Sequence, residues 1–140
     1  MTKYIFLDFD GVTHRTHGTR FECADVLAKA IANLDIKIVF STSWREYSTV
    51  ERLANFLPEK IRDKCIGKTC LISQSMPHTR FHEIMSYVKE HNISDNDWIA
   101  IDDMRVLFPL DCPNLLLIDG SSGFTKHDIK RLNEKLTLIS

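Results

Sequence analysis

Two aspartates separated by one residue stand directly after an apolar run in residues 4–12, YIFLDFDGV. A short run rich in Ile and Phe is typical of a buried strand. A buried strand has no structural use for two carboxylates, because a buried charge is costly unless it is paired or bound to a metal. Since ligands bind at the carboxyl ends of strands in open parallel sheets, Asp8 and Asp10 predict a site there. Taken alone, the spacing also fits a solvated Asp-Gly turn.

A second pair of acids, Asp102 and Asp103, follows the apolar run WIAI at residues 98–101. In a doubly wound sheet the first and fourth strands are neighbours, which would bring these two acids beside Asp8 and Asp10. Four carboxylates in one crevice repel each other unless a cation lies among them. Oxygen ligands favour Mg²⁺, which commonly shares such a site with a phosphate. The sequence therefore predicts a Mg²⁺ site formed by Asp8, Asp10, Asp102 and Asp103.

Three hydroxyl residues, Ser41, Thr42 and Ser43, follow the second apolar run. Hydroxyl and backbone N–H donors at this place can hold an anion without adding a full charge. The alternative is that they cap a helix, since Ser and Thr are favoured at the N-cap. Both interpretations hold together, because a helix N-terminus itself binds anions. Which of the three contacts the anion stays open.

A basic side chain is needed to offset the charge of a phosphoryl group in the transition state. Arg80, at the head of an expected helix, is the favoured candidate, although a solvated Arg on a helix surface is common. Lys60, Lys64 and Lys68 remain open as alternatives. Arg45 follows the hydroxyl residues and is a further candidate for contact with substrate, or else an ion-pair partner on a helix face.

The segment beside the first acid pair is polar and basic, THRTHGTR at residues 13–20. We expect it to contact the rest of the substrate, with Gly11 and His14 as candidate binding residues. The alternative is an exposed turn with incidental histidines.

Strand and helix patterns alternate along the whole chain, which predicts one α/β domain over residues 1–140. The expected architecture is a doubly wound, Rossmann-like sheet of five parallel strands with helices on both faces. Strands are expected at residues 3–9, 37–41, 65–72, 98–101 and 115–118, the third being the weakest. Helical periodicity covers residues 23–34, 47–57, 78–91 and 126–138, with Thr125 as the N-cap of the last helix.

Composition places the chain among ordinary soluble globular proteins, with 44% hydrophobic and 26% charged residues among 140. The net charge of −1 excludes a strong overall field toward nucleic acid or membrane. We find no transmembrane or signal-peptide pattern, and we expect a cytoplasmic protein that has no membrane partner. The four cysteines lack zinc or disulfide spacing and are expected to be reduced thiols.

Taken together, these motifs resemble the haloacid dehalogenase-like (HAD) phosphohydrolase superfamily. Residues 8–12 resemble its first motif, Thr42 its second, Arg80 its third and Asp102-Asp103 its acidic fourth motif. Three further segments resemble small capless HAD domains of RNA-repair proteins, namely residues 41–45 (STSWR), 80–84 (RFHEI) and 118–125 (IDGSSGFT). Arg80 departs from the commoner Lys of the third motif.

The resemblance implies phosphoryl transfer in two steps, with Asp8 as the nucleophile that forms an aspartyl-phosphate. Asp10 would protonate the leaving group and then activate water. Mg²⁺ would be held by Asp8, the Asp10 backbone carbonyl, and Asp102 or Asp103. Thr42 and Arg80 would bind the phosphoryl group.

No interval between these motifs leaves room for a cap domain, so we expect an accessible site. The expected function is Mg²⁺-dependent hydrolysis of a nucleotide, a nucleic-acid end or another accessible phosphomonoester. The alternatives are a catalytically weak HAD-like binding or regulatory module, or a receiver-type domain. A receiver domain lacks an acid two residues after its phosphoacceptor, whereas this chain has Asp10. The sequence leaves open whether the chain forms a homo-oligomer.

Overall fold

The sheet of this protein has five strands in the order β3-β2-β1-β4-β5, and all four neighbouring pairs are parallel. A computed structural model describes residues 2–72 and 77–138. The strands are β1 (Lys3–Leu7), β2 (Ile36–Phe40), β3 (Cys65–Lys68), β4 (Trp98–Asp102) and β5 (Leu115–Leu117). This confirms the doubly wound α/β fold, in which β1 and β4 lie side by side.

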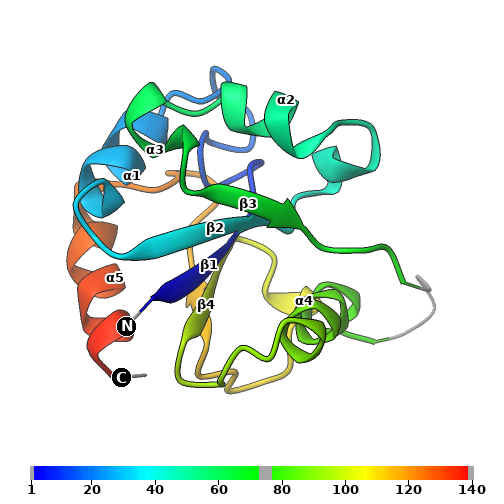
Figure 1. Ribbon diagram of the computed structural model, residues 1–140. Helices are drawn as coiled ribbons and strands as arrows, with labels where there is room; N and C mark the ends of the chain where they lie inside the picture. Colours follow the sequence, from blue (N-terminus) through cyan, green and yellow to red (C-terminus); the bar gives the residue numbers. More distant parts are fainter. Residues whose placement is uncertain (1, 73–76, 139–140) are drawn as a thin grey trace.

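Helices cover both faces of the sheet (Figure 1). They are α1 (Ala24–Ile31), α2 (Val50–Asn55), α3 (Glu59–Arg62), α4 (Thr79–Glu90) and α5 (Lys126–Leu138), with short 3-10 helices η1 (Ser43–Glu46) and η2 (Arg105–Leu107). Helices α1, α2, α3 and α5 supply side chains to one core, and α4 supplies the other. No described segment forms a cap domain, as the sequence predicts.

Alternating side chains of β1 serve the two cores. Ile5 and Leu7 lie in the core beneath α1 and α5, whereas Phe6 lies in the core beneath α4. The Phe6 ring meets Tyr87 and Trp98 edge-on, with ring centroids 5.6 Å apart in each pair. Each such buried side chain stabilises the fold by roughly 1.5–3 kcal/mol. The central strand is therefore anchored on both sides, which fixes the residues that follow it.

The expected elements differ from the structure mainly between residues 41 and 72. The strand expected at 65–72 ends at Lys68, four residues earlier than expected. The helix expected at 47–57 is confined to α2, because the Thr49 side chain accepts a hydrogen bond from Arg52 N and caps the helix start. The 3-10 helix η1 before it was not expected. Helix α3 was not expected; Pro58 precedes its first residue.

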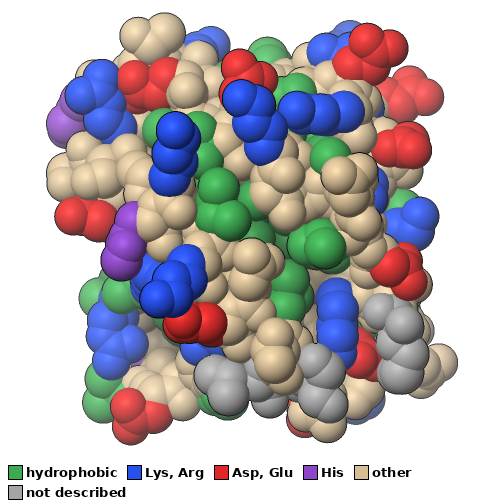
Figure 2. Space-filling view, turned by 90° about the vertical axis from the view of Figure 1, so that its left-hand side faces the viewer, with side chains coloured by type: hydrophobic (Ala, Val, Ile, Leu, Met, Phe, Trp, Pro, Cys, Tyr) green, Lys and Arg blue, Asp and Glu red, His purple; other side chains and the backbone are tan. Residues whose placement is uncertain are grey.

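One face of the molecule is formed at the amino ends of the strands, opposite their carboxyl ends. Figure 2 shows this face, where acidic and basic side chains lie interspersed with small apolar areas. Helix α5 forms part of it, and its Asp128 accepts a hydrogen bond from Thr125 N at 2.9 Å. Among the residues that the structure describes, no helix has the length and apolar character needed to cross a membrane.

Candidate active site

Three carboxylates meet where β1 and β4 end. Asp8 follows β1, Asp102 is the last residue of β4, and Asp103 comes next. One oxygen from each carboxylate lies within 4.8 Å of the others. Asp8 and Asp102 are almost fully buried, with 4% and 0% of their surface exposed. The parallel register of β1 and β4 produces this meeting, because Asp8 N donates to Ile101 O at 3.1 Å.

Burial makes this cluster electrostatically costly. It is the largest cause that raises the pKa of Asp8 well above the ordinary value for Asp, and the neighbouring charge of Asp102 adds to it. Burial likewise raises the pKa of Asp102, against the opposing effect of Arg80 and a hydrogen bond from Met104 N. A cation or a basic side chain that faces these buried carboxylates therefore stabilises their charged form.

Arg80 supplies one such charge from the first turn of α4. Its Nη1 lies 2.9 Å from Asp102 Oδ2 and 3.3 Å from Asp8 Oδ1. Burial opposes its charge, but Asp102 and Asp8 outweigh this effect and raise the pKa of Arg80 overall. Of the lysines left open by the sequence, Lys60 is exposed on α3, and the other two donate to backbone carbonyls. Lys64 Nζ donates to Leu34 O, and Lys68 Nζ donates to Arg45 O and Ser48 O.

The donor set fits Mg²⁺. All three side chains offer carboxylate oxygens, and three carboxylates against one guanidinium leave the cluster net negative. Two glycines cradle Asp103: a Cβ built on Gly11 would overlap its carboxylate, and one on Gly120 would lie 2.7 Å from its Oδ2. Gly11 also has φ +80°, which favours glycine. The carboxylate of Asp103 is thus held against bare backbone.

Asp10 lies apart from these three carboxylates. Its side chain is about half exposed. Its Oδ2 accepts a hydrogen bond from Trp44 Nε1 at 2.9 Å, and its Oδ1 lies 2.9 Å from His14 Nε2. The carboxylate therefore belongs to the open rim of the site. Asp10 as a metal ligand stays a prediction that involves its backbone carbonyl rather than its side chain.

His14 is buried behind Asp10 and keeps 4% of its surface exposed. Phe21 N donates to its Nδ1 at 3.2 Å, so the ring proton belongs on Nε2, from which it is donated to Asp10. Both ring nitrogens are therefore engaged within the protein. The structure gives His14 a position that orients Asp10, rather than the direct contact with substrate that the sequence suggested.

A model of the HAD domain in Swiss Army Knife RNA repair proteins matches residues 4–129. The chain belongs to this family. The matched range contains all of the site residues described above, and it confirms the resemblance seen in the sequence. For this HAD domain the family indicates a hydrolase of the phosphatase type. No curated protein and no solved structure gives a significant match.

The three hydroxyl residues of the HAD domain occupy different environments after β2. Thr42 is fully buried, and its Oγ1 accepts a hydrogen bond from Trp44 N at 3.3 Å, which leaves its own hydroxyl hydrogen available. Ser41 is also buried, and its Oγ has no hydrogen-bond partner among the described residues. Ser43 is exposed. The helix-cap interpretation is correct for Thr42, and the choice between Ser41 and Thr42 as phosphate ligand stays a prediction.

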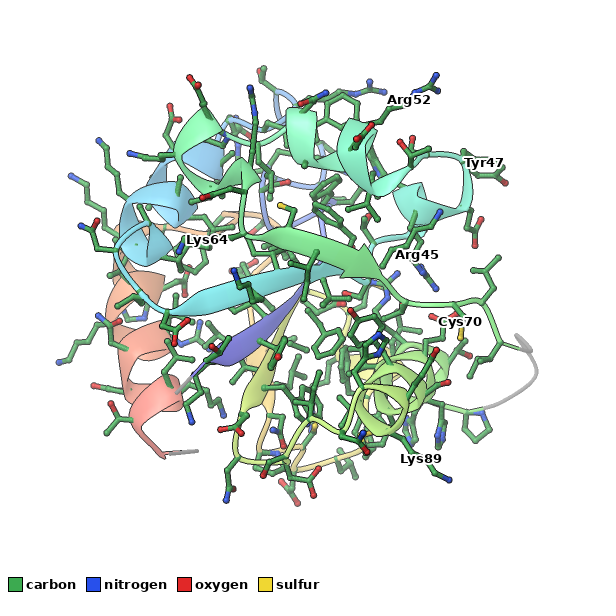
Figure 3. All side chains as sticks on the ribbon, viewed as in Figure 1. Arg45, Tyr47, Arg52, Lys64, Cys70 and Lys89 are labelled. Carbon is green, nitrogen blue, oxygen red and sulfur yellow. The ribbon has the colours of Figure 1, made fainter. Side chains whose placement is uncertain are left out.

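Arg45 points from η1 into the protein (Figure 3). Its Nη2 lies 2.7 Å from Glu83 Oε1. The guanidinium also donates to four backbone carbonyls, those of residues 41, 42, 69 and 70. These contacts use all five N–H donors of the side chain. A direct contact with substrate, as the sequence suggested, would require one of these bonds to break.

Sequence reasoning missed Trp44 as a partner of Asp10 and Glu83 as the partner of Arg45. Both residues lie within segments that the sequence singled out, but nothing in their spacing shows which atoms meet. A signal existed for Glu83. It lies on the buried face of α4 together with Ile84, Tyr87 and Val88, where an acid needs a basic partner.

Proposed function

We propose that this HAD domain is a phosphomonoester hydrolase that uses Asp8 as its nucleophile and works through an aspartyl-phosphate. The observation that supports this best is the division of labour between two aspartates only two residues apart. Asp8 is buried against Arg80 and two further carboxylates, whereas Asp10 is turned to the open rim. A nucleophile and a proton donor need those two different environments.

In the first step an oxygen of Asp8 attacks phosphorus and the bond to the leaving oxygen breaks. Asp10, whose carboxyl group is held in place by His14 and Trp44, gives its proton to that oxygen. In the second step Asp10 takes a proton from water, the water oxygen attacks phosphorus, and the Asp8 carboxylate leaves with release of inorganic phosphate. Atoms and charges balance over the two steps without a further reactant.

The remaining groups bind the phosphoryl oxygens. The Thr42 hydroxyl donates to one of them, and Arg80 balances part of their charge from its place beside Asp8. Mg²⁺ would be held by Asp8, Asp102, Asp103 and the backbone carbonyl of Asp10, and would offset the negative charge of the phosphoryl group. We propose as substrate a nucleotide, a nucleic-acid end or another accessible phosphomonoester, because none of the described segments forms a cap over the site.

Hydrolysis of p-nitrophenyl phosphate with and without Mg²⁺ tests this function, in the native protein, in Asp8→Asn and in Asp25→Asn. Asp25 is an exposed acid on α1 and serves as a matched control. We expect Mg²⁺-dependent turnover that falls by at least roughly a thousandfold in Asp8→Asn, as is usual for loss of a nucleophile, and that persists in Asp25→Asn. Equal rates in all three proteins would contradict the proposal, and inactivity of the folded native protein toward every phosphomonoester would favour a binding module.

A further inference from the structure

An open pocket of about 340 Å³ lies beside Asp10, outside the carboxylate cluster. Its wall includes Trp44, Tyr47 and Phe56, and Arg20 lies at its edge. Trp44 belongs to both places, because it lines the pocket and its Nε1 donates to Asp10 at 2.9 Å. The pocket therefore adjoins the group that protonates the leaving oxygen. Its volume falls in the range of roughly 300–1,000 Å³ that is usual for small-molecule sites.

Two aromatic rings of this pocket, those of Trp44 and Phe56, pack against other aromatic rings, whereas the third, Tyr47, is mostly exposed. Trp44 meets Phe9 and Phe56 edge-on at 5.4 Å, and Phe21 stacks on Phe56 at 5.0 Å. By contrast, 85% of Tyr47 and 42% of Phe56 are exposed. Figure 3 shows Tyr47 pointing outward, whereas Arg45 of the preceding 3-10 helix points inward. Phe56 thus offers a partly exposed ring held by its neighbours, and Tyr47 lines the same pocket with an exposed ring, so that a flat ligand can stack there.

The polar groups of the pocket match a ligand with hydrogen-bonding edges. Ser43 and Glu46 line it, and the Arg20 guanidinium carbon lies 5.2 Å from the centroid of the Trp44 ring. Arginine over an aromatic ring is a common stacking partner for a base. An aliphatic alcohol has no flat face that could stack on these aromatic side chains.

We infer that this pocket is the leaving-group subsite and that it holds the nucleobase of a nucleotide whose phosphate lies at Asp8. The inference rests on the phosphatase function proposed above, because the role of Asp10 as proton donor fixes the side from which the leaving group departs. Stacking on aromatic rings accepts every base, so the subsite selects nucleotides as a class and not one sequence. A free nucleotide and the terminal nucleotide of a strand present the same chemistry to it.

The test compares kcat/KM for substrates with and without a base. These are 5′-AMP, 3′-AMP, trinucleotides phosphorylated at either end, and ribose 5-phosphate. The variants are Tyr47→Ala, Tyr47→Phe, which keeps the ring, and Ile66→Ala, which removes a half-exposed side chain from β3. Tyr47 is outside the proposed catalytic groups and is mostly exposed, so its replacement leaves the fold intact.

We expect the native protein to prefer a base-bearing substrate over ribose 5-phosphate, and Tyr47→Ala to lose roughly 5- to 100-fold of kcat/KM on that substrate, the usual effect of removing one stacking ring. The kcat/KM of Tyr47→Ala on ribose 5-phosphate should stay within about twofold of the native value. The kcat/KM of Tyr47→Phe and of Ile66→Ala on the base-bearing substrate should also stay within about twofold of the native value. Comparison of the mononucleotides with the trinucleotides shows which source of nucleotide the subsite serves.

Two different failures can be told apart. Turnover without preference for a base, or a Tyr47→Ala protein that keeps the preference, overturns the subsite and leaves the phosphatase proposal standing. Inactivity toward all of these phosphomonoesters overturns the phosphatase proposal, and the subsite with it.

Discussion

Two buried groups of charges lie close to the carboxyl ends of the strands, and they are composed differently. The carboxylate cluster (Asp8, Asp102, Asp103) sets three acids against one guanidinium, that of Arg80. The arginine junction pairs Arg45 with Glu83, one to one, and adds four backbone carbonyls as acceptors. Helix α4 contributes one residue to each group.

The two groups differ in charge balance, and this difference indicates a structural role for the arginine junction and a functional role for the carboxylate cluster. A junction in which every donor has an acceptor ties segments together, here η1, the residues after β3 and α4. A cluster with an excess of one charge destabilises the folded chain, and such a group persists where its charge serves binding or catalysis. The sequence favoured Arg80 and kept Arg45 as a further candidate for contact with substrate; their partners in the structure separate the two roles.

The largest expected effect on stability comes from removing the charge of Glu83 from the arginine junction. Glu83→Gln keeps the shape of the side chain but leaves the Arg45 charge buried without its counter-ion. We expect the free energy of unfolding to fall by about 3 kcal/mol, near the lower end of the measured cost of breaking a buried pair. Chemical denaturation in urea measures it.

An exposed ion pair provides the control for that variant. Arg15 bonds Glu22 at the surface, so Glu22→Gln should change stability only slightly. If Glu83→Gln were as mild as Glu22→Gln, the arginine junction would not be the structural tie that its contacts indicate.

A smaller effect is expected from crowding the cluster while keeping its charge. In Gly120→Ala the new methyl would lie 2.7 Å from Asp103 Oδ2 and 2.8 Å from Thr16 Oγ1, so the Asp103 carboxylate must shift. We expect Mg²⁺ affinity to fall by roughly tenfold, as for other changes to residues that support metal ligands. Titration calorimetry measures it.

The neighbouring exposed serine gives the matched control for Gly120→Ala. Ser122→Ala should bind Mg²⁺ like the native protein, because Ser122 is exposed and its described hydrogen bonds involve only its backbone N–H and carbonyl. Unchanged affinity in Gly120→Ala would mean that Asp103 is not a ligand and that the cluster binds the metal through the other carboxylates.

The sequence predicted that Asp8, Asp102 and Asp103 meet, although it also placed the side chain of Asp10 among them. Asp8 and Asp102 end apolar runs, and the alternation of strands and helices places those runs side by side. The same reasoning predicted the sheet and the helix at 126–138. Local patterns suffice wherever one element is long and strongly periodic.

The arginine junction and the support of Asp10 could not be predicted in the same way. Arg45 reaches Glu83 across the sheet edge, and His14 turns back on Asp10 through a bond to Phe21 N. These contacts depend on the paths of irregular segments, which no periodicity describes. The sequence could suggest that His14 and Arg45 are near the site, but not that their donors are used within the protein.

The smallest expected effect is a gain in stability, in contrast to the loss expected for Glu83→Gln, and it tests the excess negative charge of the carboxylate cluster. In the presence of a chelator, Asp8→Asn removes one buried negative charge and should raise the free energy of unfolding by about 1 kcal/mol at pH 7. Burial raises the pKa of Asp8 above its ordinary value of 3.8, so the native protein loses stability as the pH rises through that raised pKa. The advantage of Asp8→Asn should therefore shrink below about pH 4, where the native carboxyl is protonated in both states, and grow as the pH rises. Urea denaturation at several pH values measures this difference.

A loss of stability in Asp8→Asn at pH 7 would show that Arg80 already balances the charge of the cluster. The excess charge would then not mark the cluster as a functional site.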